Sequence, residues 1–509
     1  MKKRIYIILY FLSFWIKGGV ELFAQDTIPI QSDYYKEAVN FYSKIWHNPA
    51  LRFSYPFRKT HEASFSWFQE ENTAYHVQEG KAKDVFCFDS HALVRKKKQL
   101  YYGSAGYRYL MREGQKWNTL ADVARLQPYI IADTIGGKMY RENYSFSGGY
   151  ARNHGRLRWG LYSSYESATT YRKTDPRPKN ETYDLNVRVG GAVAISSRYV
   201  LGGSGDFAKY QQLQNLTIVR DVGSAALFFM RGLGVTEHHF STVLNSHRHS
   251  SSMYKEKRYG GSIQLIPFSG NGFFGHFSYS QVDFRLLSTR NYEKISTFDK
   301  QLFDCSAGRS FLLYNKVHAV KLIASYHNVE GLEYNYTHAD ELLSISPKYY
   351  LKKYAAGLSI SGEGWERPKL RSLWEATVEY RKNKKEYFGI ADAPLNKEAY
   401  DCLYVSLTKN VQVPFRRSIF LCKLKAGCRY NYARKLKAGA LAAPTALETL
   451  VVPVHDFLTK NYISALLLLR YDYRLTEKYR IYTSVVGSYR AYESIGHQKA
   501  YEAKLGLAF

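Results

Sequence analysis

Cysteine is scarce in this 509-residue chain, and its distribution argues against a structural metal site. The five cysteines are Cys87, Cys305, Cys402, Cys422 and Cys428, scattered among strand-like segments. Structural zinc sites need two close pairs of ligands, but only Cys422 and Cys428 are near each other. The pattern predicts no metal site and no cofactor. It leaves one disulfide open without showing which residues would pair.

Long apolar runs are absent after residue 24. A membrane-spanning helix needs about 20 consecutive apolar residues, whereas the longest candidates, 225–230 and 465–469, have the length of strands. If the mature chain crosses a membrane, it must cross with strands. Because backbone groups in lipid must pair with one another, those strands must close into a barrel.

Motifs of common catalytic and phosphate-binding sites are also lacking. The sequence has no Gly-x-Ser-x-Gly elbow, and residues 202–205 lack the Gly-Lys-Ser/Thr ending of a phosphate loop. His455-Asp456 lies at a predicted rim and could supply half of a hydrolytic site. We expect no enzyme activity, and a rim hydrolase of lipids or peptides stays open as an alternative.

A histidine-rich stretch offers the other candidate for metal chemistry. Glu237-His238-His239 and His247-Arg248-His249 lie eight residues apart in a polar segment. Adjacent histidines point in different directions on most backbones, and the spacing matches no rigid site. We interpret the stretch as a solvated loop.

The N-terminus carries the features of a secretory signal peptide. A basic start at residues 1–4 precedes an apolar run at 5–16, and Leu22-Phe23-Ala24 fits a cleavage site. Residues 1–24 are therefore expected to be removed. Residues 25–60 are predicted to form an N-terminal periplasmic segment with a short helix from Tyr34 to Ile45.

What the chain has in abundance is aromatic side chains and alternation. It contains 46 Tyr and 28 Phe, and tyrosine suits a membrane interface, where one end of the ring is apolar and the other is wet. The last thirteen residues alternate strictly: Tyr501, Ala503, Leu505, Leu507 and Phe509 share one strand face. This pattern is typical of a strand between lipid and lumen.

Residues 61–509 repeat this alternation and predict an all-β transmembrane antiparallel up-and-down β-barrel. We expect about eighteen strands, with sixteen as the alternative. The register slips near Phe273-Phe274, which predicts a bulge. The expected strands are 61–71, 84–96, 99–112, 138–153, 156–172, 181–195, 198–213, 254–267, 272–288, 294–313, 316–336, 347–363, 368–386, 400–413, 416–433, 458–474, 477–491 and 497–509.

The connections alternate between short turns and longer polar segments. In a barrel the short turns face the periplasm and the longer loops lie outside, which places both termini at the periplasmic rim. Two of the predicted external loops, 214–253 and 434–457, are long enough to fold inward or to cover the mouth.

The formal net charge is +28, yet the basic residues are spread along strands and turns without a recognisable nucleic-acid module. We therefore predict no nucleic-acid partner. Inward-facing bases such as Arg156, Arg158 and Lys321 would give the lumen a basic character that favours anionic solutes. Contact with lipopolysaccharide phosphates or a solvated surplus at the rims are the alternatives.

Several short features carry a resemblance to known proteins. Gln25 after the signal peptide, the Tyr-rich strands and the final Leu505-Gly506-Leu507-Ala508-Phe509 resemble outer-membrane β-barrels of Bacteroides-type bacteria. Within that group the chain is similar to a family of barrels of uncharacterised function whose members accompany TonB-dependent receptors. Asn48-Pro49-Ala50 also resembles the turn after the N-terminal helix of long-chain fatty-acid transporters.

The resemblance implies a bacterial outer-membrane location and recognition of the terminal strand by the barrel-assembly machinery. Its implied partners are outer-membrane lipids, lipopolysaccharide and a TonB-dependent receptor complex. We predict a channel or transporter for small solutes with a basic lumen, because sixteen to eighteen strands enclose a wide interior. The alternatives are a non-enzymatic accessory subunit of an outer-membrane uptake or assembly complex, and the rim hydrolase.

Overall fold

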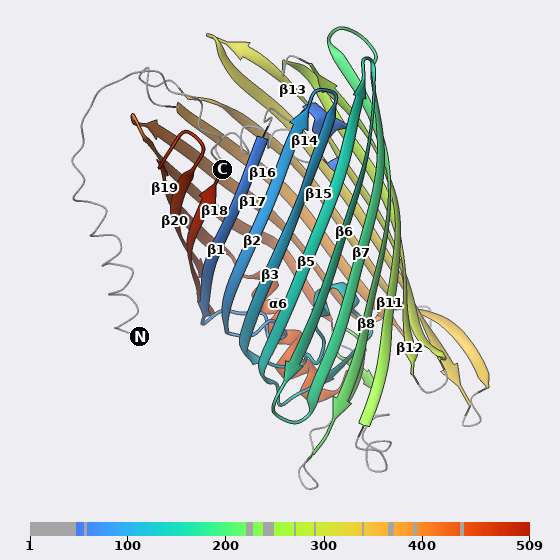
Figure 1. Ribbon diagram of the computed structural model, residues 1–509. Helices are drawn as coiled ribbons and strands as arrows, with labels where there is room; N and C mark the ends of the chain where they lie inside the picture. Colours follow the sequence, from blue (N-terminus) through green and yellow to red (C-terminus); the bar gives the residue numbers. More distant parts are fainter. Residues whose placement is uncertain are drawn as a thin grey trace.

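Eighteen antiparallel strands form one closed barrel in the computed structural model (Figure 1). The structure describes residues 47–54, 59–219, 227–237, 249–268, 271–289, 292–337, 341–364, 371–389, 394–437 and 442–509. The predicted barrel and its eighteen strands are confirmed, and the sixteen-strand alternative is wrong. The predicted signal peptide and the helix at 34–45 lie outside the described residues.

Each wall strand pairs with its sequence neighbours, and the last strand closes the barrel on the first, with Phe65 opposite Leu505. The wall strands are β1 (Lys59–Asn72), β2 (Ala82–Lys96), β3 (Gln99–Gln115), β5 (Gly137–His154), β6 (Leu157–Arg172), β7 (Arg177–Ala194), β8 (Tyr199–Thr217), β11 (His249–Pro267), β12 (Gly272–Ser288), β13 (Lys294–Leu313), β14 (Lys316–Tyr336), β15 (Leu342–Glu363), β16 (Arg371–Phe388), β17 (Pro394–Pro414), β18 (Ser418–Lys437), β19 (Tyr462–Arg474), β20 (Arg480–Tyr492) and β21 (Gly496–Ala508).

The alternation seen in the sequence separates an apolar outer face from an inner face. In β6, Leu157, Trp159 and Leu161 are 54%, 42% and 45% exposed, whereas Arg158 and Gly160 are buried. Because neighbouring side chains on a strand point to opposite faces, one face of each strand meets the surroundings and the other the interior. The outer face thus has the apolar character of a membrane barrel.

One local prediction is wrong. Strand β12 pairs with β13 without interruption from Gly272 to Leu286, and the irregularity lies between Leu286 and Leu287. Phe273 is 57% exposed and Phe274 is buried, so the two rings simply occupy opposite faces of a regular strand.

The two ends of the barrel differ, as the sequence predicted. Short hairpin connections such as Gly155-Arg156 and Tyr314-Asn315 lie at one end, here called the turn end, together with Phe509. The longer connections lie at the opposite end, the loop end, which is the lower end in Figure 1. Among the described residues no helix is both long and apolar enough to cross a membrane.

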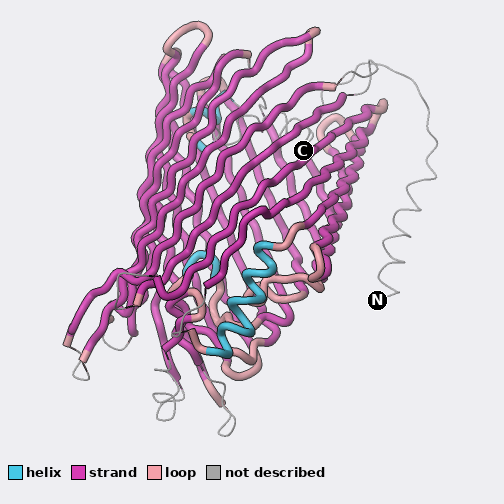
Figure 2. Tube along the Cα trace, turned by 180° about the vertical axis from the view of Figure 1, so that it is seen from behind, coloured by secondary structure: helices cyan, strands magenta, loops and turns pink. Residues whose placement is uncertain are grey.

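Three of the long connections fold into the barrel and build what we call the loop plug, residues 116–136, 227–237 and 442–460. Figure 2 shows its helices inside the loop end. The plug contains α3 (Val123–Leu126), β4 (Ile130–Asp133), β9 (Leu227–Gly232), β10 (Val235–Glu237), α5 (Pro444–Ala446), the π-helical turn η4 (Leu447–Val451) and α6 (Val452–Thr459). Inward folding is thus confirmed for the described parts of 214–253 and 434–457.

Candidate functional site

The loop plug is one assembled unit, although its three segments are far apart in the sequence. Strand β9 lies between β4 and β10 in a three-stranded sheet. The third segment joins this sheet through the backbone, because Ala443 N donates to Gly234 O at 3.2 Å. The indole Nε1 of Trp117 also donates to Thr449 Oγ1 at 2.9 Å. These bonds hold the three connections together as a small domain inside the barrel.

An apolar core fixes the plug to the wall. Trp117, Leu126 and Tyr129 of the plug are fully buried, and Gly331 on β14 leaves the space that the Tyr129 ring occupies. The remaining core comes from plug and wall residues together: Leu120, Val123, Ile130, Ile131, Ala132, Tyr210, Leu216, Ile218, Leu227, Phe228, Phe229, Met230, Val235, Tyr254, Phe284, Leu286, Phe298, Val329, Tyr349, Tyr387, Ala446 and Leu450. Such close packing resembles the interior of a soluble domain.

Buried polar contacts add specificity to this interface. Arg172 on β6 pairs with Asp133 on β4 at 2.8 Å, and neither side chain has any exposed surface. On the opposite wall, Arg231 of β9 pairs with Glu333 of β14, and His455 Nδ1 of α6 lies 3.0 Å from Glu398 Oε1 of β17. Contacts of this kind reach strands on both sides of the barrel, so the plug spans its cross-section.

The turn end is occupied by a second inward segment, residues 47–54, which we call the turn-end segment and which contains the 3-10 helix η3 (Leu51–Ser54). Asn48, Ala50 and Leu51 have no exposed surface. The Asn48 amide donates to Gly191 O at 3.2 Å and Gly203 O at 3.0 Å. The segment is therefore bound to the inner wall of β7 and β8.

Three inward glycines on adjacent strands make room for the turn-end segment. A Cβ added at Gly160 would lie 2.7 Å from Pro49 C, and one at Gly190 would lie 2.0 Å from Asn48 Oδ1. At Gly202 the added atom would meet Leu51 Cδ1 at 2.8 Å. Any larger side chain at these places would displace the segment. The segment can therefore bind only where the wall strands carry glycine, and we call these three glycines the glycine cradle.

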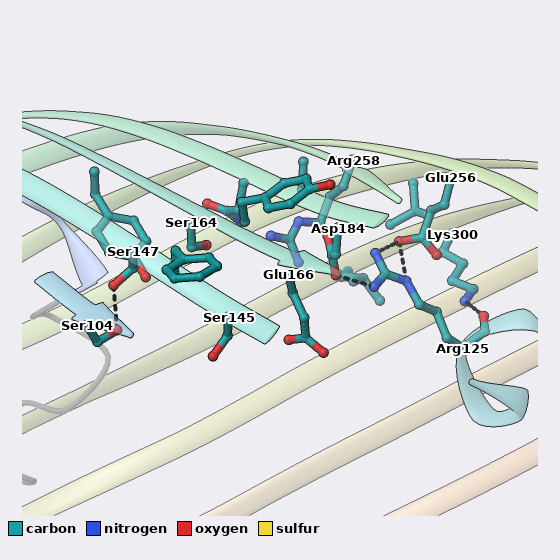
Figure 3. A pocket seen from close by; sticks show the side chains of 17 residues that line it. Ser104, Arg125, Ser145, Ser147, Ser164, Glu166, Asp184, Glu256, Arg258 and Lys300 are labelled. Carbon is teal, nitrogen blue, oxygen red and sulfur yellow. Dashed lines mark hydrogen bonds and ion pairs between the residues drawn. The ribbon is translucent and has the colours of Figure 1, made fainter. Parts of the chain in front are cut away.

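A chamber remains between the loop plug and the turn-end segment, and Figure 3 shows the larger of its two cavities. It consists of a cavity of about 440 Å³ and an adjoining cavity of about 260 Å³. The two share the lining residues Tyr162, Ser164 and Asn186, so they lie directly next to each other. Arg125 of the plug lines the larger cavity, whereas His47 and Arg52 of the turn-end segment line the smaller one.

Charged side chains gather where the chamber meets the plug. Arg125 Nη1 donates to Asp184 Oδ2 at 2.6 Å, and its Nη2 donates to Glu256 Oε1 at 2.8 Å. Burial alone would lower the pKa of Arg125, but the hydrogen bonds and charges of Glu256 and Asp184 outweigh burial and raise it. Lys300 Nζ donates to the Arg125 carbonyl at 2.9 Å. The part of the larger cavity next to the plug therefore offers hydrogen-bond donors and acceptors side by side, and it can bind ligand groups that both donate and accept.

Hydroxyl groups dominate the opposite part of the larger cavity. Ser104 and Ser147 are 2.7 Å apart through their Oγ atoms, and Ser145 and Ser164 lie on the same lining. Each hydroxyl can donate and accept. This face therefore suits ligands that carry several hydroxyl groups.

The structure places the three predicted lumen residues differently. Arg158 is inward and buried, with its guanidinium 5.3 Å from the Phe268 ring centroid. Lys321 shares the inner face of β14 with buried Ala319. Arg156 lies in the turn between β5 and β6 and is exposed at the rim. None of the three lines the chamber.

The cysteines and histidines of the chain are the other candidates for chemistry. The five cysteines are all free. Most of the histidine-rich stretch, 238–248, lies outside the described residues. Within the part of the chain that the structure describes, no group of three or more His, Cys, Asp or Glu side chains is arranged to hold a metal ion.

The residues that build the chamber were not found from the sequence. The connection between the expected strands 99–112 and 138–153 has the length of an external loop, yet it carries Trp117, Leu126 and Ile130. So many apolar residues in a polar connection were a usable signal for burial. Arg125, Asp184 and Glu256 meet only in the folded chain, and no spacing reveals them.

The sequence profile of a family described as a family of unknown function, DUF6850, matches residues 49–509. No curated protein matches the chain. Among solved structures, the ferric yersiniabactin uptake receptor FyuA from Yersinia pestis has a TM-score of 0.41 at 9% identity, with 88% of this chain and 80% of that chain covered. The ferric preacinetobactin receptor BauA from Acinetobacter baumannii gives 0.39 at 7% identity, with coverages of 89% and 80%. At such scores the function must be argued from this chain's own residues.

Proposed function

The chain belongs to the family of unknown function DUF6850, and we propose that it is a gated outer-membrane barrel that transports a small solute. The observation that carries the proposal is the loop plug: it is packed on the wall like a domain core, yet it consists only of loop-end connections. A lumen filled in this way does not support a permanently open pore. Transport then requires the plug to move, as lids and gates do in other proteins.

Location in a bilayer is supported by the outer face. Large apolar side chains such as Leu322, Ile463 and Leu505 are 62%, 67% and 53% exposed on strands. Exposed apolar surface on this scale is costly in water and favourable in lipid. We place the loop end outside and the turn end in the periplasm, in the outer membrane of a Bacteroides-type bacterium.

A basic lumen is part of the same proposal. On the inner faces of β2 and β3, Lys83 lies directly opposite Arg112, and Arg108 shares that face four residues away along β3. Lys321 and Lys353 face inward on β14 and β15. Carboxylates such as Glu256 and Asp472 also face inward, so the basic excess is moderate. We expect the open state to prefer anions over cations.

Planar bilayer recordings test the gate. The wild type should show little conductance, whereas a variant in which residues 118–132 are replaced by a Gly/Ser linker of equal length should open large, stable channels. Reversal potentials in a salt gradient should then indicate anion selectivity. Circular dichroism and heat-modifiable gel migration verify that the variant barrel is folded. A folded variant that conducts no better than the wild type contradicts the gate.

An accessory role is a second candidate, favoured by the length of one hairpin. Strands β14 and β15 have 21 and 22 residues, while about 9–11 residues cross a membrane. The hairpin therefore extends beyond the bilayer, with Leu343 67% exposed near its tip. A TonB-dependent receptor is the partner we propose. Recovery of a clean monomer from mild detergent, by mass photometry, would count against it.

We do not propose a rim hydrolase. The His455 side chain is 8% exposed and its ring faces Glu398 on the wall. A catalytic histidine must reach substrate, whereas this ring is enclosed where the helix meets β17. We propose instead that His455 helps to hold α6 in place.

A further inference from the structure

The chamber is long enough to hold a small molecule in one orientation. Asp184, Asn186 and Arg188 follow one another on the inner face of β7. Four residues of strand span about 13 Å, so the charged end near Asp184 and the end near Arg188 are that far apart. Cavities of about 440 and 260 Å³ are within the range of small-molecule sites.

The smaller cavity has an excess of positive charge. The described residues that line it are His47, Arg52, Tyr102, Tyr162, Ser164, Asn186 and Arg188, and none of them is a carboxylate. The carboxylates of the larger cavity each face a base. Glu166 lies 3.4 Å from Arg141, and Asp184 and Glu256 both bind Arg125. Asp206, directly opposite Arg188 on β8, lies 3.4 Å from Arg258 and so also faces a base. The bases near Arg52 and Arg188 therefore leave a positive balance that favours an incoming anion.

These two guanidinium groups are held in position. Arg52 lies 4.5 Å from the Tyr102 ring centroid, and Arg188 Nη1 donates to the His47 carbonyl at 3.0 Å. The rings of Tyr102 and Tyr162 stack with centroids 6.0 Å apart. A guanidinium held in a fixed orientation loses little further side-chain freedom when an anion binds.

The other half of a ligand would meet hydroxyl groups. Ser104, Ser145, Ser147 and Ser164 line the larger cavity beside Asn186. Hydroxyl and amide groups both donate and accept, so they match the hydroxyls of a sugar-like molecule. An apolar ligand would remove these polar groups from water without offering them hydrogen bonds, which is unfavourable.

We propose that the chamber binds a small acidic molecule rich in hydroxyl groups, such as a sugar acid or a sugar phosphate. Its acidic group lies between Arg52 and Arg188, and its hydroxyls lie along the four serines. The inference rests on the proposed function in that this molecule is the solute the barrel transports.

Binding to the full-length protein in detergent tests the inference by isothermal titration calorimetry. The probes are glucuronate, glucose 6-phosphate, glucose, acetate and inorganic phosphate. We expect glucuronate or glucose 6-phosphate to bind at least about 10-fold more tightly than glucose, since a charge-assisted hydrogen bond contributes that much. Each should also bind more tightly than acetate or phosphate, which lack the hydroxyls.

Four variants separate the site from general effects. R188Q should weaken binding of the acidic sugars at least about 10-fold, and R188K should retain part of it because the charge remains. R381Q removes an inward arginine that lines neither cavity and should change nothing. S164L puts a larger side chain on the lining that both cavities share and should abolish binding of every sugar.

Several results would overturn the inference: equal affinity for glucose and glucuronate, equal effects of R188Q and R381Q, or acetate binding as tightly as glucuronate. Binding is measured on the closed wild type and does not require conductance. If the wild type binds the acidic sugars but the plug variant does not conduct, the proposed function is wrong and this inference stands as a binding site. If the plug variant conducts but the wild type does not bind the acidic sugars, only this inference is wrong.

Discussion

Arg172 and Asp133 form an ion pair in which Nη2 lies 2.8 Å from Oδ2 and neither side chain reaches solvent. The pair joins wall strand β6 to plug strand β4. Two charges are removed from water together, so each depends on the other. Carbonyls accept from two of the Arg172 nitrogens, because Nε lies 3.2 Å from Thr174 O and Nη2 lies 2.7 Å from Pro176 O, whereas Nη1 is buried without a partner among the described residues.

Replacing Asp133 with asparagine should loosen the plug. The Gly136 N–H donates to Asp133 Oδ1 at 2.7 Å, and the amide oxygen of D133N can still accept this bond. The substitution nevertheless leaves Arg172 as a buried charge without a counter-ion. Loss of one partner of a buried pair costs about 3–5 kcal/mol. Hydrogen exchange of amides 116–136, followed by mass spectrometry, should become faster by the corresponding factor.

The control is an exposed pair on the same barrel. Lys179 and Glu181 are 2.8 Å apart with side chains 58% and 35% exposed, and E181Q should change stability by about 1 kcal/mol or less. Equal exchange in the wild type and D133N would show that the buried pair does not secure the plug.

The glycine cradle predicts a position-specific effect. In G190A the new methyl group would overlap Asn48 Oδ1, since the added Cβ lies 2.0 Å from that atom, while nothing lies within 4 Å of a Cβ at neighbouring Gly191. We expect G190A to release the turn-end segment at a cost of about 1–3 kcal/mol, and G191A to leave it bound. Hydrogen exchange of residues 47–54 measures the difference. Equal protection of the segment in both variants would contradict the cradle.

The barrel could be predicted because its evidence is local. Alternation along a single strand, as in Leu157, Arg158 and Trp159, is enough to assign the two faces. Eighteen such strands with short and long connections in turn leave few topologies open. Even the closing of the C-terminal strand on β1 followed from this pattern.

The plug could not be predicted because its contacts join distant segments. Trp117 and Thr449 are 332 residues apart in the chain, and nothing in the sequence around either residue indicates that the two are in contact. The chamber is even harder to predict from the sequence, because the plug positions Arg125 while the wall positions Asp184 and Glu256. Its existence depends on the shape left between two folded units, which no single segment encodes.

The contact between Trp117 and Thr449 should separate packing from hydrogen bonding. T449V removes the acceptor of the indole N–H and also the hydroxyl that donates to Thr445 O at 2.6 Å, and we expect a loss of about 1–2 kcal/mol. W117A also removes a fully buried ring from the core and should cost about 3–5 kcal/mol. Exchange of amides 447–459 measures both. Equal effects would mean that the ring contributes little beyond its hydrogen bond.

Stability should depend on pH through His76, which lies in the β1–β2 connection. Its ring contacts the Phe457 ring of α6 edge to face, with the two ring centroids 6.1 Å apart. Burial lowers the pKa of His76, with opposing contributions from Glu79 and Glu398 and a further lowering by Lys385. Below the ordinary histidine pKa of about 6.5, the unfolded chain gains a proton that the folded chain does not, so stability falls as the pH drops. In H76N this part of the slope, at most about 1.4 kcal/mol per pH unit, should disappear. Thermal unfolding followed by near-ultraviolet circular dichroism between pH 7.5 and 5.5 compares the two proteins, and parallel curves would exclude His76 as the titrating group.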